Sequence, residues 1–281
     1  MDKLLLVDGH NLLFQMFYGM PARIINEDGK AIQGTLGFIG ALLKIIRMIR
    51  PDYLTVLFDS ERENSRMELD AQYKANRTDY SHVSEEENPF SQLADVYAAL
   101  DFMGIRHAEA ATLEADDIIA SYALAYGRGL EIVIASWDSD FFQLIDDHVS
   151  VLRYRGVKTL LCDRAYIQQK YGVTPEQYAD FKALTGDAAD NIKGADQIGP
   201  KNAARLLSEF RTLDNILANA GQIAKPSIRA SVMRNAQRLQ TNQQLIRLGG
   251  KAGLPFALNM LSYQYDGVKT NEVLAGIGLK K

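Results

Sequence analysis

Short apolar runs alternate with amphipathic segments through the first half of the chain. Residues 4–7, 53–58 and 131–135 are almost entirely apolar, which is typical of strands that are buried on both faces. Apolar side chains recur with helical spacing from about 35 to 50, which predicts an amphipathic helix. Further helices are predicted near 90–103 and over 114–126, with a short strand near Ile105. This rhythm predicts an α/β fold, with a mostly parallel, twisted sheet and helices on both of its faces.

The second half of the chain has a different pattern. From about residue 164 onward the apolar spacing is almost wholly helical, and neither an internal repeat nor a low-complexity linker interrupts it. We therefore predict an α/β core over residues 1–172 and a helical subdomain over 173–281. Within the core, residues 60–88 form a highly charged stretch that is too long for an ordinary connection between elements.

Composition excludes several classes of protein. At 281 residues, with 47% hydrophobic and 23% charged side chains, the chain is globular and can bury one large core or two smaller ones. The single cysteine, Cys162, cannot form an internal disulfide, and the N-terminal apolar run is too short for a signal peptide. Lys44 and Arg47 interrupt the apolar helix, so no membrane span is expected. A cytoplasmic protein is predicted, and with a net charge of -4 any nucleic-acid binding must use a local basic surface.

Acidic side chains follow the predicted strands and begin the predicted helices. Because the carboxyl ends of parallel strands share one edge of a sheet, these acids should crowd together and require a cation near neutral pH. With oxygen ligands and no ligand-spaced His or Cys, the expected cation is Mg²⁺ or Mn²⁺. Each acid alone is better explained as a turn or helix-cap residue, and only their repetition at successive strand ends favours the metal site. The nine acids are Asp8, Asp59, Glu114, Asp116, Asp117, Asp138, Asp140, Asp187 and Asp190.

Two further segments have the chemistry to bind phosphate. In the charged stretch, Lys74 and Arg77 would project from one face of a helical turn and could grip a phosphodiester, although a solvated charged helix is the alternative. In the helical half, Gly194 and Gly199 permit a tight turn before a helix that starts at Pro200. A turn of this kind binds phosphate through its backbone N–H groups, or else simply connects two helices.

These motifs, in this order and spacing, resemble a known family. They are Leu6-Val7-Asp8-Gly9-His10-Asn11, Phe58-Asp59, Arg66, Tyr73-Lys74-Ala75-Asn76-Arg77, Glu114-Ala115-Asp116-Asp117, Asp138-Ser139-Asp140 and Gly186-Asp187-Ala188-Ala189-Asp190-Asn191-Ile192. The chain resembles the 5′ nuclease domain of bacterial DNA polymerase I and the stand-alone 5′–3′ exonucleases of the flap endonuclease superfamily. The resemblance extends from Met1 to about Gly249, and since no polymerase follows, the stand-alone form is expected.

The resemblance implies a PIN-like nuclease core with a helical arch near 60–100 and a DNA-binding helix-hairpin-helix element near 186–210. Lys74 and Arg77 would meet the scissile phosphate, and Tyr73 would stack on the terminal base. The first metal would be held by Asp8, Asp59, Glu114 and Asp116, and the second by Asp138, Asp140, Asp187 and Asp190, with Asp117 supporting between them. DNA contacts, with a potassium ion at the turn, are implied for Arg66, Lys193, Gly194, Ile198, Gly199, Lys201, Asn202 and Arg205.

The implied activity is structure-specific 5′–3′ exonuclease and flap endonuclease cleavage of DNA or RNA–DNA hybrids. Two Mg²⁺ or Mn²⁺ ions would support it, the products would carry 5′-phosphates, and the protein would act as a monomer in replication and repair in the bacterial cytosol. The sequence departs from the family pattern at Trp137, Ser139 and Lys193 and in the acidic residues 85–87. Two alternatives stay open: a non-catalytic DNA-junction-binding paralogue, and a Mg²⁺-dependent phosphatase, since Asp138-Ser139-Asp140 mimics an Asp-x-Asp nucleophile motif.

Overall fold

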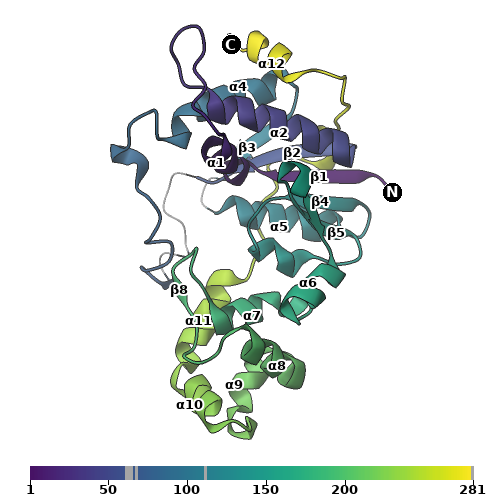
Figure 1. Cartoon of the computed structure of the whole chain (residues 1–281). Coiled ribbons are helices and arrows are strands. Elements are labelled where there is room, and N and C mark those ends of the chain that lie inside the picture. The colour runs from purple at the N-terminus through teal and green to yellow at the C-terminus, as the bar shows by residue number, and fades with distance from the viewer. Residues whose placement is uncertain (61–65, 67–68, 111–112, 280–281) are drawn as a thin grey trace.

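A six-stranded sheet forms the centre of the upper part of the molecule in a computed structural model (Figure 1). The structure describes residues 1–60, 66, 69–110 and 113–279. The strands are β1 (Lys3–Asp8), β2 (Tyr53–Phe58), β3 (Arg106–Glu109), β4 (Glu131–Ala135), β5 (Val149–Arg153) and β6 (Leu160–Cys162). Only β6 runs antiparallel to its neighbour, so the predicted α/β fold with a mostly parallel sheet is confirmed. The sequence did not predict β5 and β6.

The strand order β3-β2-β1-β4-β5-β6 places a topological switch point between β1 and β4. The chain builds outward from β1 to β3 in one direction and from β4 to β6 in the other. In such a sheet, ligands bind in the crevice beyond the carboxyl ends of the two strands at the switch point. Asp8 ends β1, and Ser136 follows β4, so polar residues occupy this crevice.

Helices cover both faces of the sheet, as predicted. One face packs against α1 (Gly9–Gly19), α2 (Gln33–Ile49) and α4 (Leu93–Phe102), and α5 (Ala115–Tyr126) lies on the other face. The strands are buried on both sides because Leu5 and Val7 face one apolar core while Leu4 and Leu6 face the other. This alternation explains the continuous apolar runs in the sequence. The sequence did not predict α1, whose first turn is polar.

A helical region lies below the sheet (Figure 1) and shares an apolar core with α5. Its helices are α6 (Arg164–Tyr171), α7 (Tyr178–Thr185), α8 (Pro200–Phe210), α9 (Leu213–Ala218), α10 (Pro226–Arg234) and α11 (Ala236–Ile246). A short antiparallel hairpin of β7 (Gly186–Asp187) and β8 (Ile192–Lys193) separates α7 from α8. Among the described residues, every helix is too short or too polar to cross a bilayer.

The C-terminal segment returns to the sheet. Ser262 bridges to Tyr53 at the start of β2, and α12 (Thr270–Gly276) packs against α2 and α4, where it lies at the top of Figure 1. Val273 and Leu274 are buried in the same core as those helices.

The expected arch segment has only turns, bends and short 3-10 helices between residues 70 and 92, after which α4 begins. Residues 61–65 and 67–68 of the expected arch lie outside the described residues. Successive turns occupy 71–76, followed by short 3-10 helices at Tyr80–His82 and Pro89–Gln92. The predicted helical turn at Lys74 and Arg77 is therefore wrong, since Lys74 has a left-handed backbone with φ of 57°. Hydrogen bonds from Arg77 N–H to Lys74 C=O and from Tyr73 N–H to Asp70 C=O close tight turns instead.

Candidate metal centre and nucleic-acid interface

Three strand ends bring acidic side chains to the switch-point crevice. Asp8 accepts hydrogen bonds from the Asn11 backbone N–H at 3.1 Å and from the Ser136 hydroxyl at 2.8 Å. Asp59, after β2, accepts the Ala115 N–H at 2.8 Å. Asp138, after β4, accepts the Asp140 N–H at 2.8 Å. With these hydrogen bonds the acids cap turns and helix starts, as expected of acids at strand ends. Each carboxylate can still accept further hydrogen bonds or bind a metal ion.

The start of α5 supplies the next group of acids. Glu114 is the N-cap residue of α5, and Asp116 and Asp117 lie in its first turn, where acids complement the helix dipole. Glu114 is buried and forms ion pairs with Arg66 and Lys74. Arg66 also donates to Asp117 at 2.8 Å, so the predicted DNA contact Arg66 is a buried partner of two acids in this structure.

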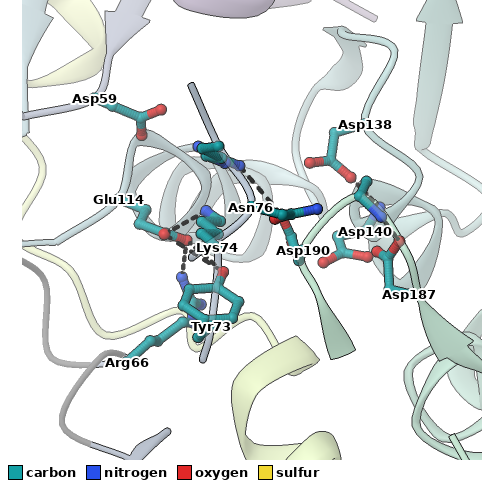
Figure 2. Close-up of polar contacts among 12 residues, drawn as sticks. Asp59, Arg66, Tyr73, Lys74, Asn76, Glu114, Asp138, Asp140, Asp187 and Asp190 are labelled. Carbon is teal, nitrogen blue, oxygen red and sulfur yellow. Dashed lines mark hydrogen bonds and ion pairs between the residues drawn. The ribbon is translucent and has the colours of Figure 1, made fainter. Parts of the chain in front are cut away.

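A third group of acids joins the sheet to the hairpin. Asp140, Asp187 and Asp190 each offer a carboxylate oxygen, and these three atoms lie within 4.8 Å of one another. Asp140 begins a 3-10 helix after β4, Asp187 ends β7, and Asp190 lies in the hairpin turn. Figure 2 shows Asp138, Asp140 and Asp187 on one side of the crevice, Glu114 on the other, and Asp190 between them.

The crowding of these acids changes their proton affinities. Burial, with Asp59 and Asp138 nearby, raises the pKa of Asp8 to about 7. Burial also raises the pKa of Asp140 to about 7, even though a neighbouring lysine opposes the shift. The pKa of Asp116 lies well above its usual range because of burial and three nearby carboxylates. Asp59 is the exception, since hydrogen bonds from His10 and Ala115 outweigh its burial and lower its pKa to about 2.

This set of donors fits hard divalent cations. The ligand atoms are carboxylate oxygens, which Mg²⁺ and Mn²⁺ prefer. The raised pKa of Asp8 and of Asp140 means that the charged forms of these side chains are poorly compensated by the protein alone. A bound cation would stabilise the charged forms. Charge interactions link Asp8, Asp59, Asp116 and Asp138, and Asp138 also lies near the group formed by Asp140, Asp187 and Asp190. Glu114 and Asp117 share Arg66 as a partner.

The basic pair of the charged stretch points into the crevice. Lys74 pairs with Glu114 (Figure 2), and the Arg77 guanidinium lies 3.2 Å from a carboxylate oxygen of Asp190. The segment is held by the hairpin, because Lys74 N–H donates to the Asp190 carbonyl at 3.0 Å and Asn76 donates to the Ala188 carbonyl at 3.0 Å. Arg77 is exposed and can reach a ligand without leaving its turn.

Tyr73 lies deeper than its predicted role requires. Its side chain is only 3% exposed, and its hydroxyl is 3.3 Å from Glu114. Stacking on a terminal base requires the ring to move out of this position, so that role stays a prediction.

Sequence reasoning missed Lys182. This lysine lies on α7, is buried, and forms ion pairs with both Asp140 and Asp187. Although burial opposes it, the surrounding carboxylates raise the pKa of Lys182, so the side chain is charged. Its position in the helical sequence Tyr178–Thr185, four to five residues before Gly186 and Asp187, was the available signal.

The predicted phosphate-binding turn follows the hairpin. Gly186 has φ of 81° and packs directly on Gly194, where a Cβ at either position would lie within 2.5 Å of backbone atoms. Gly199 has open space and an ordinary φ, so the turn does not require glycine there. Lys193, Gly199, Lys201 and Arg205 are exposed, Gly194 and Asn202 are half-buried, and Ile198 is buried.

A groove of about 680 Å³ connects this turn to the acids. It runs from Asp187 past Lys193 and Gly194 to Arg238 on α11. Arg238 was not predicted, because it is distant in sequence from every motif.

Comparisons with known proteins agree with this architecture. A family model described as the 5′-3′ exonuclease N-terminal resolvase-like domain matches residues 3–172, and one described as the 5′-3′ exonuclease C-terminal SAM fold matches residues 173–268. Thermostable DNA polymerase I of Thermus filiformis is 37% identical over 88% of this chain, and DNA polymerase I of Deinococcus radiodurans is 35% identical over 87%. The chain spans only 28% and 25% of the lengths of these relatives.

Solved structures show the same fold. A bacteriophage T5 D15 flap endonuclease variant, in a pseudo-enzyme-product complex with DNA and metal ions, superposes with a TM-score of 0.71. It is 22% identical, and the match covers 98% of this chain and 93% of that one. A T5 5′-exonuclease with bound zinc gives a TM-score of 0.72 at 23% identity, over 88% of this chain and 89% of that one. With the two family models together spanning nearly all of the described residues, the chain belongs to the 5′-3′ exonuclease family.

Proposed function

We propose that this protein is a metal-dependent 5′ nuclease that hydrolyses phosphodiesters of DNA at 5′ ends and at the junctions of 5′ flaps. The observation that carries the proposal is the cluster of Asp140, Asp187 and Asp190, whose carboxylate oxygens lie within 4.8 Å of one another, with the Arg77 guanidinium beside Asp190 and the Lys74 ammonium beside Glu114. The acids supply metal ligands, and the basic pair supplies a site for the phosphate. A phosphatase would need its Asp-x-Asp motif after the first strand, whereas Asp138 follows β4 here.

The charge balance of the crevice supports two divalent ions. Nine acids and four basic side chains give the site a formal charge of -5 when all are ionised; the four basic residues are Arg66, Lys74, Arg77 and Lys182. Two divalent cations would supply four positive charges. Asp8, Asp59, Glu114 and Asp116 would hold one ion, Asp138, Asp140, Asp187 and Asp190 the other, and Asp117 would support them through Arg66.

The ions would polarise the phosphodiester and lower the pKa of an attacking water. The basic side chains of the protein would position the phosphate and neutralise its negative charge. Arg77, exposed at the crevice, would leave Asp190 and donate to a non-bridging phosphate oxygen, where such contacts stabilise developing charge. Lys74 would do the same once an ion takes its place at Glu114. Release of the 3′ oxygen as leaving group would give 5′-phosphate products.

The turn between the hairpin and α8 would bind the duplex part of the substrate. Its exposed cations, Lys193, Lys201 and Arg205, flank backbone N–H groups at the start of α8, and Gly194 lets the chain pass closely against Thr185. Asn202 and the backbone at Ile198 complete the surface, and a potassium ion would bridge the turn to a phosphate. Such contacts recognise structure rather than base sequence and weaken with salt.

The remaining assignments follow from the same proposal. Residues 1–172 would form the catalytic core and 173–281 the helical subdomain that holds the duplex. Mg²⁺ is the expected physiological ion, with Mn²⁺ as a substitute. We propose a monomer that acts in the bacterial cytosol on DNA and on RNA–DNA hybrids.

Cleavage of end-labelled substrates tests the proposal. A 5′-flapped duplex, the same flap made of RNA, a blunt duplex and a single strand would be incubated with Mg²⁺ or with chelator. We expect Mg²⁺-dependent cutting near the flap junction, and a loss of roughly hundredfold or more in Asp187→Asn. Asp214→Asn, which neutralises an exposed acid on α9, is the matched control and should cut normally. Tight flap binding without any cutting would instead identify a non-catalytic junction binder.

A further inference from the structure

Basic partners are distributed unevenly among the acids of the crevice. Within the described part of the chain, neither lysine nor arginine forms an ion pair with Asp8, Asp59, Asp116 or Asp138. The acids nearer the hairpin are different, because Lys182 and Arg77 pair with them. Before any metal binds, the strand-end acids therefore lack Lys or Arg ion-pair partners among the described residues, whereas the hairpin acids already have them.

Lys182 lies at the centre of the hairpin group. It is buried, with 6% of its surface exposed, and its ammonium contacts both Asp140 and Asp187. Those two carboxylates, with Asp190, are the three whose oxygens lie within 4.8 Å of one another. The ammonium thus binds two of the three carboxylates that would have to coordinate an ion.

An ammonium and a divalent ion oppose each other at such a site. A carboxylate oxygen that coordinates a metal loses most of its capacity to accept from Lys182, and the two positive charges repel at short range. Lys182 also helps to keep the hairpin acids in place without metal, because it bridges Asp140, which begins the 3-10 helix after β4, to Asp187 on β7. Its flexible four-carbon stem lets the ammonium move aside when an ion binds.

We propose that Lys182 is a resident cation that competes with the second metal and makes the hairpin site weaker than the strand-end site. The two ions would then bind in order, first at the strand-end site and afterwards at the hairpin site. This inference rests on the proposed function, because it concerns the affinities of that same pair of ions. It makes Lys182 a positioning residue, since it acts on the ligands and not on the substrate.

A metal titration without substrate tests this directly. Free Mn²⁺ would be counted by electron paramagnetic resonance as it is added to the metal-free protein. We expect one tight ion and a second whose Kd is at least about tenfold higher, a gap of about 1.4 kcal/mol. In Lys182→Met the second Kd should fall about tenfold or more, while the first stays within about twofold.

Three further variants test whether the change in Mn²⁺ affinity comes from Lys182 and from the hairpin site, and not from misfolding. Lys30→Met removes an exposed lysine that pairs with Asp95 and should leave both Kd values unchanged. Lys182→Gln keeps a polar group beside Asp140 and should tighten the second site in the same direction, with thermal melting confirming that both variants are folded. Asp187→Asn in the Lys182→Met background should abolish the tightened site.

The outcomes separate this inference from the proposed function. If wild type binds two Mn²⁺ ions and both Lys182 variants leave the second Kd unchanged or raise it, competition by Lys182 is wrong and the nuclease proposal stands. If wild type binds no Mn²⁺, or cuts no substrate in Mg²⁺, the proposed function fails as well. Failure of both variants to fold in Ca²⁺ would show that Lys182 is required for the fold and would overturn its role as a mere competitor.

Discussion

Arg23 and Glu86 form a 2.5 Å ion pair that ties the loop after α1 to the acidic segment at 85–87. A second contact lies nearby, since the hydroxyl of Tyr18, near the end of α1, is 2.9 Å from the hydroxyl of Tyr80 and 3.5 Å from the Glu87 carbonyl. The acidic segment departs from the family pattern, and this pairing gives it a partner inside the protein. Glu86 therefore has a structural role that does not require contact with DNA.

Removal of this ion pair should loosen the segment without unfolding the protein. In Arg23→Ala, backbone amides at 79–88 should exchange hydrogen for deuterium severalfold faster, because local opening becomes easier. The melting temperature should hardly change, since exposed ion pairs contribute little to global stability. Glu85→Gln is the control, because it removes a neighbouring charge for which the described residues offer no ion pair. Equal exchange in wild type and Arg23→Ala would contradict the anchoring role.

Divalent ions should stabilise the folded protein. An ion present at ten times its Kd adds about 1.4 kcal/mol, because it binds the native acids and not the unfolded chain. For a chain of this size we expect the melting temperature to rise by roughly 3–5 °C between chelator and Mg²⁺. Differential scanning fluorimetry measures the shift. Asp8→Asn should reduce it, whereas Asp214→Asn should preserve it, and an unchanged melting temperature in wild type would contradict a preformed site.

Tyr73 allows two roles to be distinguished. Its hydroxyl lies 3.3 Å from Glu114, whereas its predicted role in base stacking uses only the ring. If stacking matters, Tyr73→Phe should cut a flap at nearly the wild-type rate, and Tyr73→Ala should lose about 1–3 kcal/mol of substrate affinity. Single-turnover cleavage and binding in Ca²⁺ give the two quantities. An equal loss in both variants would assign the role to the hydroxyl at Glu114 instead.

Cys162 should be inert in the native protein. Its side chain is fully buried at the sheet edge, and burial raises the pKa of the thiol to about 11. Because the folded state holds the thiol proton more tightly than the unfolded chain, Cys162 destabilises the fold only as the pH rises above the ordinary thiol value toward 11. At pH 8 Ellman's reagent should label the native protein very slowly and the urea-unfolded protein at once. Rapid native labelling would show that the thiolate is accessible.

The sequence predicted what depends on local pattern. Apolar runs identified β1, β2 and β4, and the acids that follow them lie where parallel topology requires. It did not predict β5, because Ser150 and the acids before the strand obscure the apolar run. The predicted helical turn at Lys74 is wrong for a tertiary reason, since hydrogen bonds to the hairpin hold the segment in successive tight turns.

The parts of the site that were missed depend on distant pairings. Lys182 is one of several lysines in the helical half, and only the packing of α7 beneath the sheet shows that it contacts Asp140 and Asp187. Arg238 reaches the groove because α11 packs on α7. The sequence has no spacing that points to Arg238, and the position of Lys182 before Gly186 and Asp187 does not by itself reveal its ion pairs. Most of the carboxylates could be found because they follow a strand or start a helix.

The return of the chain to the sheet affects how the helical region can move. Gly276 of α12 lies so close to Phe102 of α4 that an added Cβ would be 2.1 Å from the ring, and Tyr263 N–H donates to the Asp52 carbonyl at 2.9 Å. The helices from α7 to α11 are therefore an insertion whose two connections both end on the same rigid body. Such an insertion can rock about its paired connections but cannot drift away as a domain on a single linker would. A single backbone cut within it would leave two fragments still held together by the packing of α12 on α2 and α4.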